Sequence, residues 1–221
     1  MKFDAIIFDF DGVLLESEYA GNAQIAEYLT AIGHPTSMED SMAHFMGLAG
    51  QEFLAALESW IGRPLPDDFH DLREAENQRV LTQGLDPVAG AIAFLRGLPD
   101  RLPRAIASSS GSHWIETHLD HLGVRDAFGP HIYSGKEHVV RGKPAPDIYL
   151  HAAHAIGADI RRTVILEDSP VGAKGAVASG AHVIGLCAGR HCGVGHAERL
   201  RALGVHDVAA DFTDVARLLG A

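Results

Sequence analysis

The sequence predicts an α/β fold, a doubly wound parallel sheet with an α-helical domain inserted after its first strand. Three observations support this prediction. Short apolar runs that end in polar residues recur along the chain, as in strands buried within a parallel sheet. From Gly84 onward these runs alternate with helical patterns, which predicts βα units joined by right-handed crossovers. Residues 17–83, by contrast, show helical periodicity and no convincing strand.

The composition limits the possible functions. The 221 residues suffice for one large domain or two modest ones, and a hydrophobic fraction of 47% is typical of a globular protein. The net charge of −11 argues against nucleic acid or an anionic membrane as a partner. We expect no membrane span, and no signal peptide because the first strand begins directly, so the expected location is cytoplasmic. Two cysteines exclude a disulfide framework.

The first predicted strand is residues 5–8, an apolar run followed at once by two aspartates. Asp9 and Asp11 lie at the carboxyl end of this strand, and Gly12 permits a sharp turn there. Because alternate residues of an extended segment point the same way, both carboxylates are expected to face one crevice. Two like charges so close together need a cation or a proton between them. A plain strand-ending turn is the alternative interpretation.

The elements that follow are assigned from their periodicity and their glycine and proline breaks. Within the helical segment, helices are predicted over residues 23–32, 38–46 and 51–61, with a fourth opened by Asp67 and Asp68. Further strands are predicted at residues 104–107, 132–134, 163–166 and 181–186, with a short edge strand at 208–209. Further helices are predicted at residues 91–98, 114–122, 148–156, 172–179 and 197–203 and at the C-terminus. Residues 1–16 and 84–221 are therefore assigned to a core domain and residues 17–83 to a helical cap domain.

Polar side chains follow the predicted strands at the point where each ends. Ser108 to Gly111 follow the second strand, Glu167 and Asp168 follow the fourth, and Lys143 lies in a proline-flanked loop before a helix. Carboxylates suit a hard cation such as Mg²⁺, whereas a hydroxyl and a lysine suit phosphate oxygens. This set predicts phosphoryl transfer. Taken singly, each residue could instead belong to a turn, a solvated surface or a helix cap.

Four motifs, in order, resemble those of the haloacid dehalogenase-like hydrolases. They are Asp9-Phe10-Asp11-Gly12-Val13, Ser108, Lys143-Pro144-Ala145-Pro146-Asp147 and Glu167-Asp168-Ser169. The similarity covers essentially the whole chain, including the helical cap, and is greatest to the branch that holds sugar-phosphate phosphatases and β-phosphoglucomutase. It implies a Rossmann-like catalytic core.

The resemblance also implies roles for these residues. Asp9 would be the nucleophile that becomes an aspartyl phosphate, and Asp11 would protonate the leaving oxygen and then deprotonate the attacking water. Ser108, Ser109 and Lys143 would hold the phosphoryl oxygens.

The cofactor implied by the resemblance is Mg²⁺. Its ligands would be the Asp9 carboxylate, the Asp11 backbone carbonyl and Asp168, with Glu167 reaching the ion directly or through water. A dehalogenase has no need of the metal or of a second acid, so Asp11 and Asp168 favour a phosphate substrate. A signalling receiver module is disfavoured because receivers are shorter and lack an inserted cap.

The closer alternatives are a phosphatase and a β-phosphoglucomutase-like mutase. A mutase must hold a second phosphate with cationic groups of the cap. Residues 17–83 contain eleven Asp and Glu, three Arg and no Lys, a net charge of −8, and Gly50 stands where the mutase carries an arginine. We therefore expect a phosphatase acting on a small phosphorylated metabolite. The residues expected to read the substrate are Ser17, Glu18, Phe45, Gly47 and Gly50. The oligomeric state is left open.

One cluster lies outside these motifs. Cys187, His191, Cys192 and His196 could suggest zinc, but their spacing fits no usual zinc knuckle. The segment joins a strand to a helix, so we expect a loop in which these cysteines and histidines are incidental.

Overall fold

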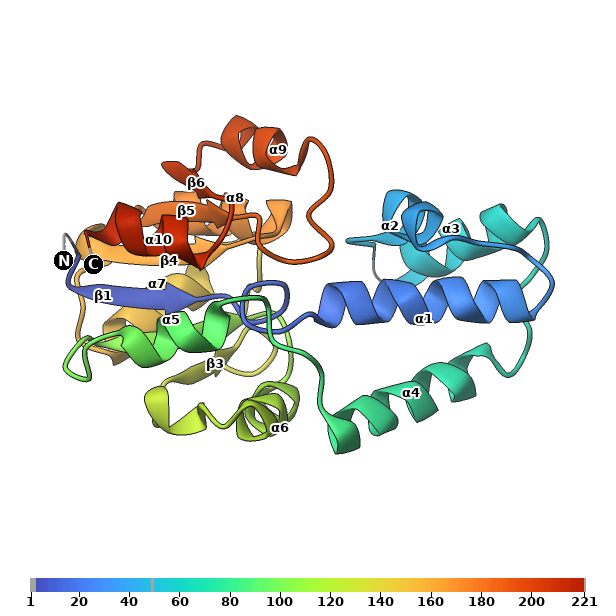
Figure 1. Cartoon of the computed structure of the whole chain (residues 1–221), viewed down its shortest axis with the longest axis horizontal. Helices are drawn as coiled ribbons and strands as arrows, with labels where there is room; N and C mark the ends of the chain where they lie inside the picture. Colours follow the sequence, from blue (N-terminus) through green and yellow to red (C-terminus); the bar gives the residue numbers. More distant parts are fainter. Residues whose placement is uncertain (1–2, 49, 221) are drawn as a thin grey trace. The chain divides into compact units, whose positions relative to one another are not determined.

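The computed structural model describes residues 3–48 and 50–220, and the chain divides into two compact units (Figure 1). The core unit combines Met1–Glu16 with Gly84–Ala221. The inserted unit is Ser17–Gln83. Among the described residues, no helix is both long enough and apolar enough to cross a membrane.

The core unit is built on a parallel sheet. Within the described part of the chain it has six strands in the order β3-β2-β1-β4-β5-β6, and every neighbouring pair runs parallel. The strands are β1 (Ala5–Phe8), β2 (Arg104–Ser108), β3 (Ile132–Ser134), β4 (Thr163–Glu167), β5 (His182–Leu186) and β6 (Asp207–Ala209). This order confirms the predicted doubly wound sheet, because the winding reverses direction at β1.

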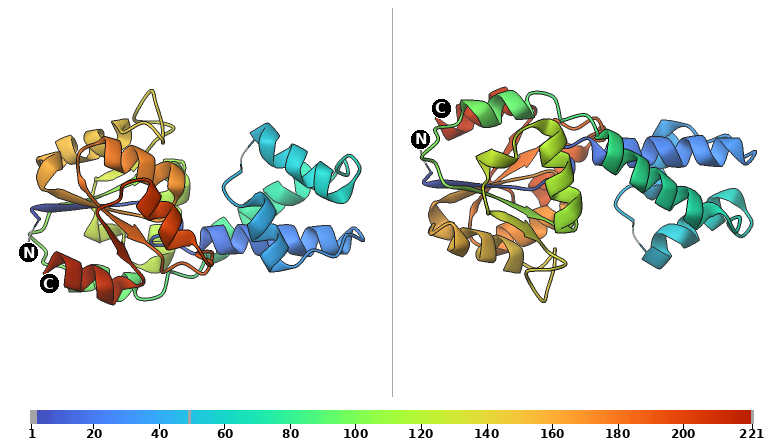
Figure 2. Two further views of the ribbon diagram at one scale, coloured as in Figure 1. Left: turned by 90° about the horizontal axis from the view of Figure 1, so that it is seen from above. Right: turned by 90° about the horizontal axis from the view of Figure 1, so that it is seen from below.

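Helices cover both faces of the sheet (Figure 2). One face is packed by α5 (Ala91–Gly97), α6 (Ser112–Leu122) and α10 (Phe212–Leu219), and the other by α7 (Asp147–Ala155) and α8 (Pro170–Ala178). The side chains of β1 alternate between these layers, with Ile6 and Phe8 on the first and Ile7 on the second. The remaining helix, α9 (His196–Ala202), packs beside β5 and β6, and η1 (Arg125–Ala127) and η2 (Ile160–Arg162) are short 3₁₀ turns. Burial on both sides explains why these strands are continuous apolar runs.

The start of α8 differs from the sequence prediction. Residues 172–179 were expected, but the helix begins at Pro170. Proline is well tolerated in the first turn of a helix, where its missing N–H would have no partner within the helix. Ser169 caps this end, because its hydroxyl accepts a hydrogen bond from the Gly172 N–H at 3.0 Å. The loop between Glu167, the last residue of β4, and α8 is therefore short, and it holds Asp168 close to the end of the strand.

The inserted unit is helical, as predicted. Its elements are α1 (Ser17–Ala31), α2 (Met38–Phe45), α3 (Gly50–Ile61) and α4 (Phe69–Gln83). These helices bury a small apolar core that includes Leu29 and Leu57. Phe45 belongs to this core and is 3% exposed, with its ring against Trp60. The expectation that Phe45 reads the substrate is therefore wrong, because its side chain is used in packing.

Candidate active site

The polar residues after β1, β2 and β4 lie at one edge of the sheet. These three strands are neighbours, and Phe8 is in register with Ile106 of β2 and Leu166 of β4. The next residue, Asp9, donates its backbone N–H to the Leu166 carbonyl at 2.9 Å. The carboxyl ends of adjacent strands at a reversal of strand order form the usual binding crevice of such sheets.

Lys143 joins two of the carboxylates at this edge. Its Nζ lies 2.7 Å from Asp9 Oδ1 and 2.9 Å from Glu167 Oε2, and the lysine side chain is 3% exposed. The loop that carries it, with a cis Lys143–Pro144 peptide, runs close to α8. A Cβ on Gly175 would lie 2.9 Å from the Ala145 carbonyl oxygen, so the close approach requires glycine there.

Glu167 is held by four hydrogen bonds. Oε2 accepts from Lys143 and, at 2.6 Å, from the Tyr149 hydroxyl, while Oε1 accepts from the N–H and the hydroxyl of Ser169 at 3.0 and 2.7 Å. A Cβ on Gly172 would lie 2.2 Å from this carboxyl group, so glycine leaves room for it. Both oxygens of Glu167 are thus occupied by protein donors. The sequence offered no sign of the contact with Tyr149.

Burial and charge shift the pKa values of these groups in opposite directions. Burial, with the adjacent Glu167, raises the pKa of Asp9 well above its usual range. Burial also opposes the charged form of Glu167, but the Lys143 charge and the hydrogen bonds to the carboxylate outweigh it and lower the pKa. The same two carboxylates outweigh burial at Lys143 and raise its pKa, so the ammonium stays charged.

The residues present fit a divalent cation. Asp9, Glu167 and Asp168 offer ligand atoms that all lie within 4.8 Å of one another, and all three residues are buried. One lysine does not balance three buried carboxylates, and oxygen donors of this kind suit Mg²⁺. Because the oxygens of Glu167 already accept from the protein, Asp9 and Asp168 are the carboxylates best placed to contact an ion directly.

Asp11 makes a separate set of contacts. Its Oδ2 accepts from the Ser110 hydroxyl at 2.6 Å and from the Ser108 hydroxyl at 3.3 Å, and its Oδ1 accepts from the Trp114 indole N–H at 3.1 Å. The backbone has left the extended conformation here, since Gly12 has a φ of +79°. Simple strand alternation therefore no longer decides where Asp11 points. Ser109, also expected to bind phosphate, is exposed.

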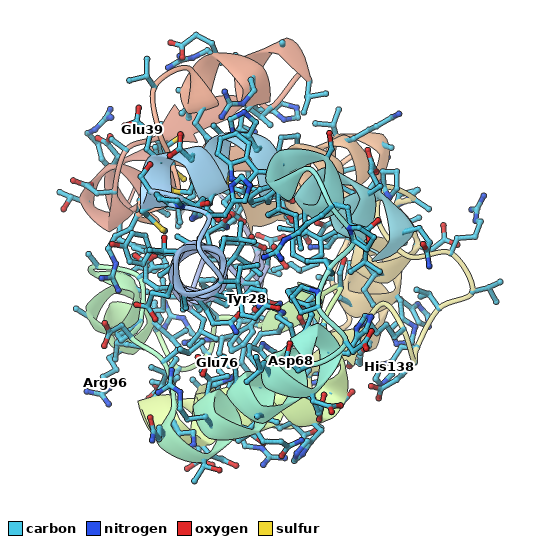
Figure 3. The ribbon with its side chains drawn as sticks, turned by 90° about the vertical axis from the view of Figure 1, so that its right-hand side faces the viewer. Tyr28, Glu39, Asp68, Glu76, Arg96 and His138 are labelled. Carbon is cyan, nitrogen blue, oxygen red and sulfur yellow. The ribbon has the colours of Figure 1, made fainter. Side chains whose placement is uncertain are left out.

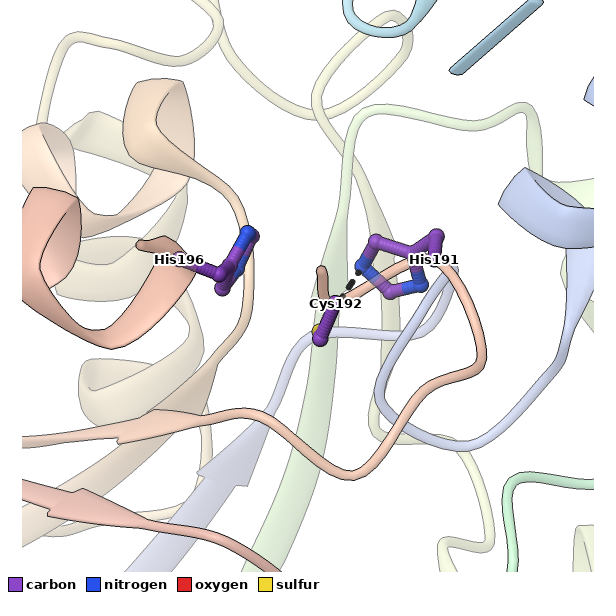
Figure 4. A group of neighbouring side chains, drawn as sticks. All are labelled: His191, Cys192 and His196. Atoms are coloured by element: carbon purple, nitrogen blue, oxygen red, sulfur yellow. Dashed lines mark hydrogen bonds between the residues drawn. The ribbon is translucent and has the colours of Figure 1, made fainter. Parts of the chain in front are cut away.

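The segment between β5 and the start of α9 reaches this site through contacts with Asp168. Figure 4 shows its side chains His191, Cys192 and His196. His191 Nε2 lies 2.8 Å from Asp168 Oδ2, and the His196 Nε2–H donates to the Asp168 backbone carbonyl at 2.7 Å. Cys192 Sγ is 3.3 Å from His191 Nε2. Both histidines therefore contact a residue of the carboxylate group, which the expectation of incidental histidines did not include. Sequence spacing could not reveal this, since the loop and Asp168 belong to different βα units.

Comparison with known proteins agrees with this geometry. The family model of haloacid dehalogenase-like hydrolases matches residues 3–180, most of the chain. The chain belongs to the haloacid dehalogenase-like hydrolases. The expected family and the expected hydrolase class of enzyme are confirmed.

Two solved structures of this family are similar over almost their whole length. A haloacid dehalogenase-like protein from Agrobacterium tumefaciens is 36% identical with a TM-score of 0.89, over 99% of this chain and 98% of that one. A family hydrolase from Deinococcus radiodurans, with bound phosphate and sodium, is 32% identical with a TM-score of 0.88, over 99% and 96%. Among characterised relatives, hexitol phosphatase A of Escherichia coli is 29% identical over 84% of each chain. The 6-phosphogluconate phosphatase of that organism is 25% identical over 86% of this chain and 85% of its own.

The substrate-reading residues expected in this hydrolase lie in different parts of the inserted unit. Ser17 and Glu18 form the first turn of α1 and are half-buried. Gly47 and Gly50 are exposed and have positive φ angles of 80° and 55°. A Cβ at either glycine would meet no atom within 4 Å, so conformation rather than crowding favours glycine there.

The inserted unit of this hydrolase is acidic, and its arginines have local partners. Glu39, Asp68 and Glu76 are among its acidic side chains (Figure 3). Arg79 pairs with Glu76 at 2.6 Å. Arg63 donates to the Ile32 carbonyl at 3.1 Å, and Arg73 donates to the Gln24 side chain.

Proposed function

We propose that this hydrolase is a Mg²⁺-dependent phosphatase that hydrolyses a small phosphorylated metabolite, a sugar phosphate or similar monoester. The observation that carries the proposal is the buried group of Asp9, Glu167 and Asp168 with Lys143 against two of its members. It combines a carboxylate nucleophile, whose ionised form a bound cation would favour, with a cationic donor for a phosphoryl group. The named phosphatases among the relatives support the same reaction. Such metabolites are charged and do not cross a bilayer, so the proposed location is cytoplasmic.

In the first half-reaction, an Asp9 carboxylate oxygen attacks phosphorus and the ester P–O bond breaks. Asp11 transfers its proton to the departing oxygen, and the Asp9 carboxylate becomes an aspartyl phosphate. Ser108, Ser109 and Lys143 donate to the phosphoryl oxygens. When bound by Asp9, the Asp11 carbonyl and Asp168, with Glu167 directly or through water, Mg²⁺ supplies positive charge to the same oxygens.

In the second half-reaction, Asp11 is a carboxylate and accepts a proton from a water molecule. The water oxygen attacks phosphorus, the bond between phosphorus and Asp9 breaks, and inorganic phosphate leaves. Lys143 remains charged throughout, because its pKa is raised by Asp9 and Glu167 against the effect of burial. Asp9 and Asp11 then return to their starting states.

The substitution Asp9→Asn tests the nucleophile. It preserves the shape of the side chain but removes the attacking charge, so we expect phosphate release to fall to background while the protein stays folded. Asp4→Asn is the matched control, because Asp4 precedes the opposite end of β1 and, among the described residues, forms its ion pair with the exposed Arg162. Substantial turnover by Asp9→Asn would rule out the aspartyl-phosphate mechanism.

A phosphatase is favoured over a mutase by the charge of residues 17–83, which we propose act as a cap. This segment carries a net charge of −8, and its three arginines donate to partners within the unit. A second phosphate would therefore meet repulsion there. Ser17, Glu18, Gly47 and Gly50 remain the proposed substrate-reading positions.

A substrate screen distinguishes the two reactions. With Mg²⁺, we expect phosphate release from monoesters such as 6-phosphogluconate, hexitol phosphates and fructose 1-phosphate, which the names of relatives suggest. We expect no isomerisation of β-glucose 1-phosphate to glucose 6-phosphate, even with a bisphosphate primer. Efficient isomerisation with negligible phosphate release would establish the mutase instead.

A further inference from the structure

The loop after β5 and the first residue of α9, together residues 187–196, contact Asp168 at two points. The His191 side chain contacts the carboxylate, with 2.8 Å between Nε2 and Oδ2, and His196 contacts the backbone carbonyl at 2.7 Å. All three residues are buried, with exposures of 4% or less. Both the side chain and the main chain of Asp168 are thus held by the same short segment.

Two glycines make room for the contact between His191 and Asp168. A Cβ on Gly12 would lie 2.1 Å from Asp168 Oδ2 and 2.9 Å from His191 Cε1. A Cβ on Gly189 would lie 2.5 Å from His191 Cε1 and 2.6 Å from His191 Nδ1. The imidazole therefore lies in a closely packed slot between the loop after β1 and its own loop. Such packing restricts the ring to one orientation.

A soft metal held by the loop is the alternative use of these side chains. His191, Cys192 and His196 offer donor atoms within 4.8 Å of one another. Both nitrogens of His196, however, already have hydrogen-bond partners. Nε2 donates to the Asp168 carbonyl, and Nδ1 accepts from the Arg199 guanidinium at 3.3 Å. A metal bound through His196 would have to break one of these contacts, so the geometry favours hydrogen bonding over coordination.

We propose that His191 and His196 are positioning residues that hold Asp168 in the orientation needed to bind the divalent cation. This inference rests on the proposed function, because it assigns Asp168 to the Mg²⁺ site. A carboxylate already fixed by hydrogen bonds loses less conformational freedom when it binds an ion. Removing such an outer contact typically weakens metal binding by about 10- to 100-fold.

The experiment measures Mg²⁺ binding by isothermal titration calorimetry on the full chain without substrate. We expect His191→Leu to raise the Mg²⁺ Kd by about 10- to 100-fold. His191→Gln, whose amide nitrogen can take the place of Nε2, should recover most of the affinity. His196→Leu should also weaken binding. The matched control is His182→Leu, because His182 pairs with Asp207 at the same 2.8 Å, on β5 and β6.

The possible outcomes separate this inference from the proposed function. If the wild-type chain does not bind Mg²⁺, the proposed metal-dependent function fails. If the wild type binds and His191→Leu binds equally well, only the positioning role is overturned. Equal losses in His191→Leu and His191→Gln would also overturn it, because restoring the donor would have no effect. If His191→Leu does not fold, the Mg²⁺ affinities of His191→Gln and His191→Asn are compared instead. The shorter side chain of asparagine does not reach Asp168, so the His191→Asn protein should bind Mg²⁺ more weakly, and equal affinities would overturn the positioning role.

A Co²⁺ titration tests the alternative directly. A thiolate-to-cobalt charge-transfer band that disappears in Cys192→Ala would show that the loop coordinates metal, and it would overturn the positioning role. We expect no such band.

Discussion

Asp11 and Trp114 are 103 positions apart in the sequence, yet the indole N–H of Trp114 donates to Asp11 Oδ1 at 3.1 Å. The tryptophan ring also packs against His118, with 4.3 Å between ring centroids. Trp114 lies in the first turn of α6, directly after the loop that follows β2. The end of one strand and the start of the next helix therefore both contribute to the surroundings of the proposed acid–base residue.

Trp114→Phe should lower kcat by about 3- to 10-fold, with little change in KM. The substitution preserves most of the ring packing but removes one hydrogen bond that orients Asp11, and such a bond contributes about 1 kcal/mol. Steady-state phosphate release provides the measurement. Trp60→Phe is the control, because it removes a comparable indole hydrogen bond, to Thr36 at 3.0 Å, inside the inserted unit. Equal effects of the two substitutions would contradict a specific role for Trp114.

Glu167→Gln should lower the free energy of unfolding by about 3 kcal/mol at pH 7 without metal. In glutamine an NH₂ group replaces one carboxylate oxygen, and it cannot accept the hydrogen bonds that this oxygen receives. Lys143 also loses a buried counter-charge. Urea unfolding measures the change. Glu198→Gln removes an exposed pair with Arg201 and should change stability by less than about 0.5 kcal/mol. A loss at Glu167 as small as this would show that its contacts are not energetically important.

Removal of metal should abolish phosphate release, and added Mg²⁺ should restore it. Ca²⁺ should inhibit, because its larger and more variable coordination shell disturbs the in-line geometry. Mg²⁺ should also raise Tm, since an ion present at 100 times its Kd stabilises the folded state by about 2.7 kcal/mol. Activity with EDTA and thermal unfolding with each ion test these expectations. Turnover that persists in EDTA would favour the dehalogenase type of chemistry.

His118 should make the protein less stable at acidic pH. Its side chain is fully buried, neither ring nitrogen has a hydrogen-bond partner among the described residues, and burial lowers its pKa to about 4. Below about pH 6.5 the unfolded chain binds a proton at this residue that the folded chain does not bind until about pH 4. Stability is therefore lost as the pH falls through this window, by up to about 3 kcal/mol.

The variant His118→Leu isolates this contribution. Its stability relative to the wild type should increase as the pH falls from 7 to 4, as measured by urea unfolding at several pH values. Parallel stability curves for the two proteins would show that His118 titrates alike in the folded and unfolded states.

The sequence was sufficient for most of the secondary structure and for the fold class. Its apolar runs identified β1 and β4, because strands buried on both faces need apolar side chains at every position. The predicted start of α8 is too late in the sequence. Proline usually interrupts a helix, but Pro170 lies in the first turn of α8, where proline is tolerated. Phe45 was misassigned because its position close to Gly47 and Gly50 in the sequence does not reveal whether its side chain is exposed or packs in the core of the inserted unit.

The sequence by itself determined the α/β class, the inserted helical segment and the set of carboxylates, hydroxyls and lysine proposed to carry the chemistry. These follow from local periodicity and from motifs in which neighbouring residues act together. Only the tertiary structure decided that Tyr149 and Ser169 donate hydrogen bonds to the Glu167 carboxylate. It also decided that Trp114 contacts Asp11 and that His191 contacts Asp168. The physical reason is that most of these partners come from different βα units, which the parallel sheet brings to one edge. The distances between such residues depend on strand order and helix packing, and no local pattern in the chain records either.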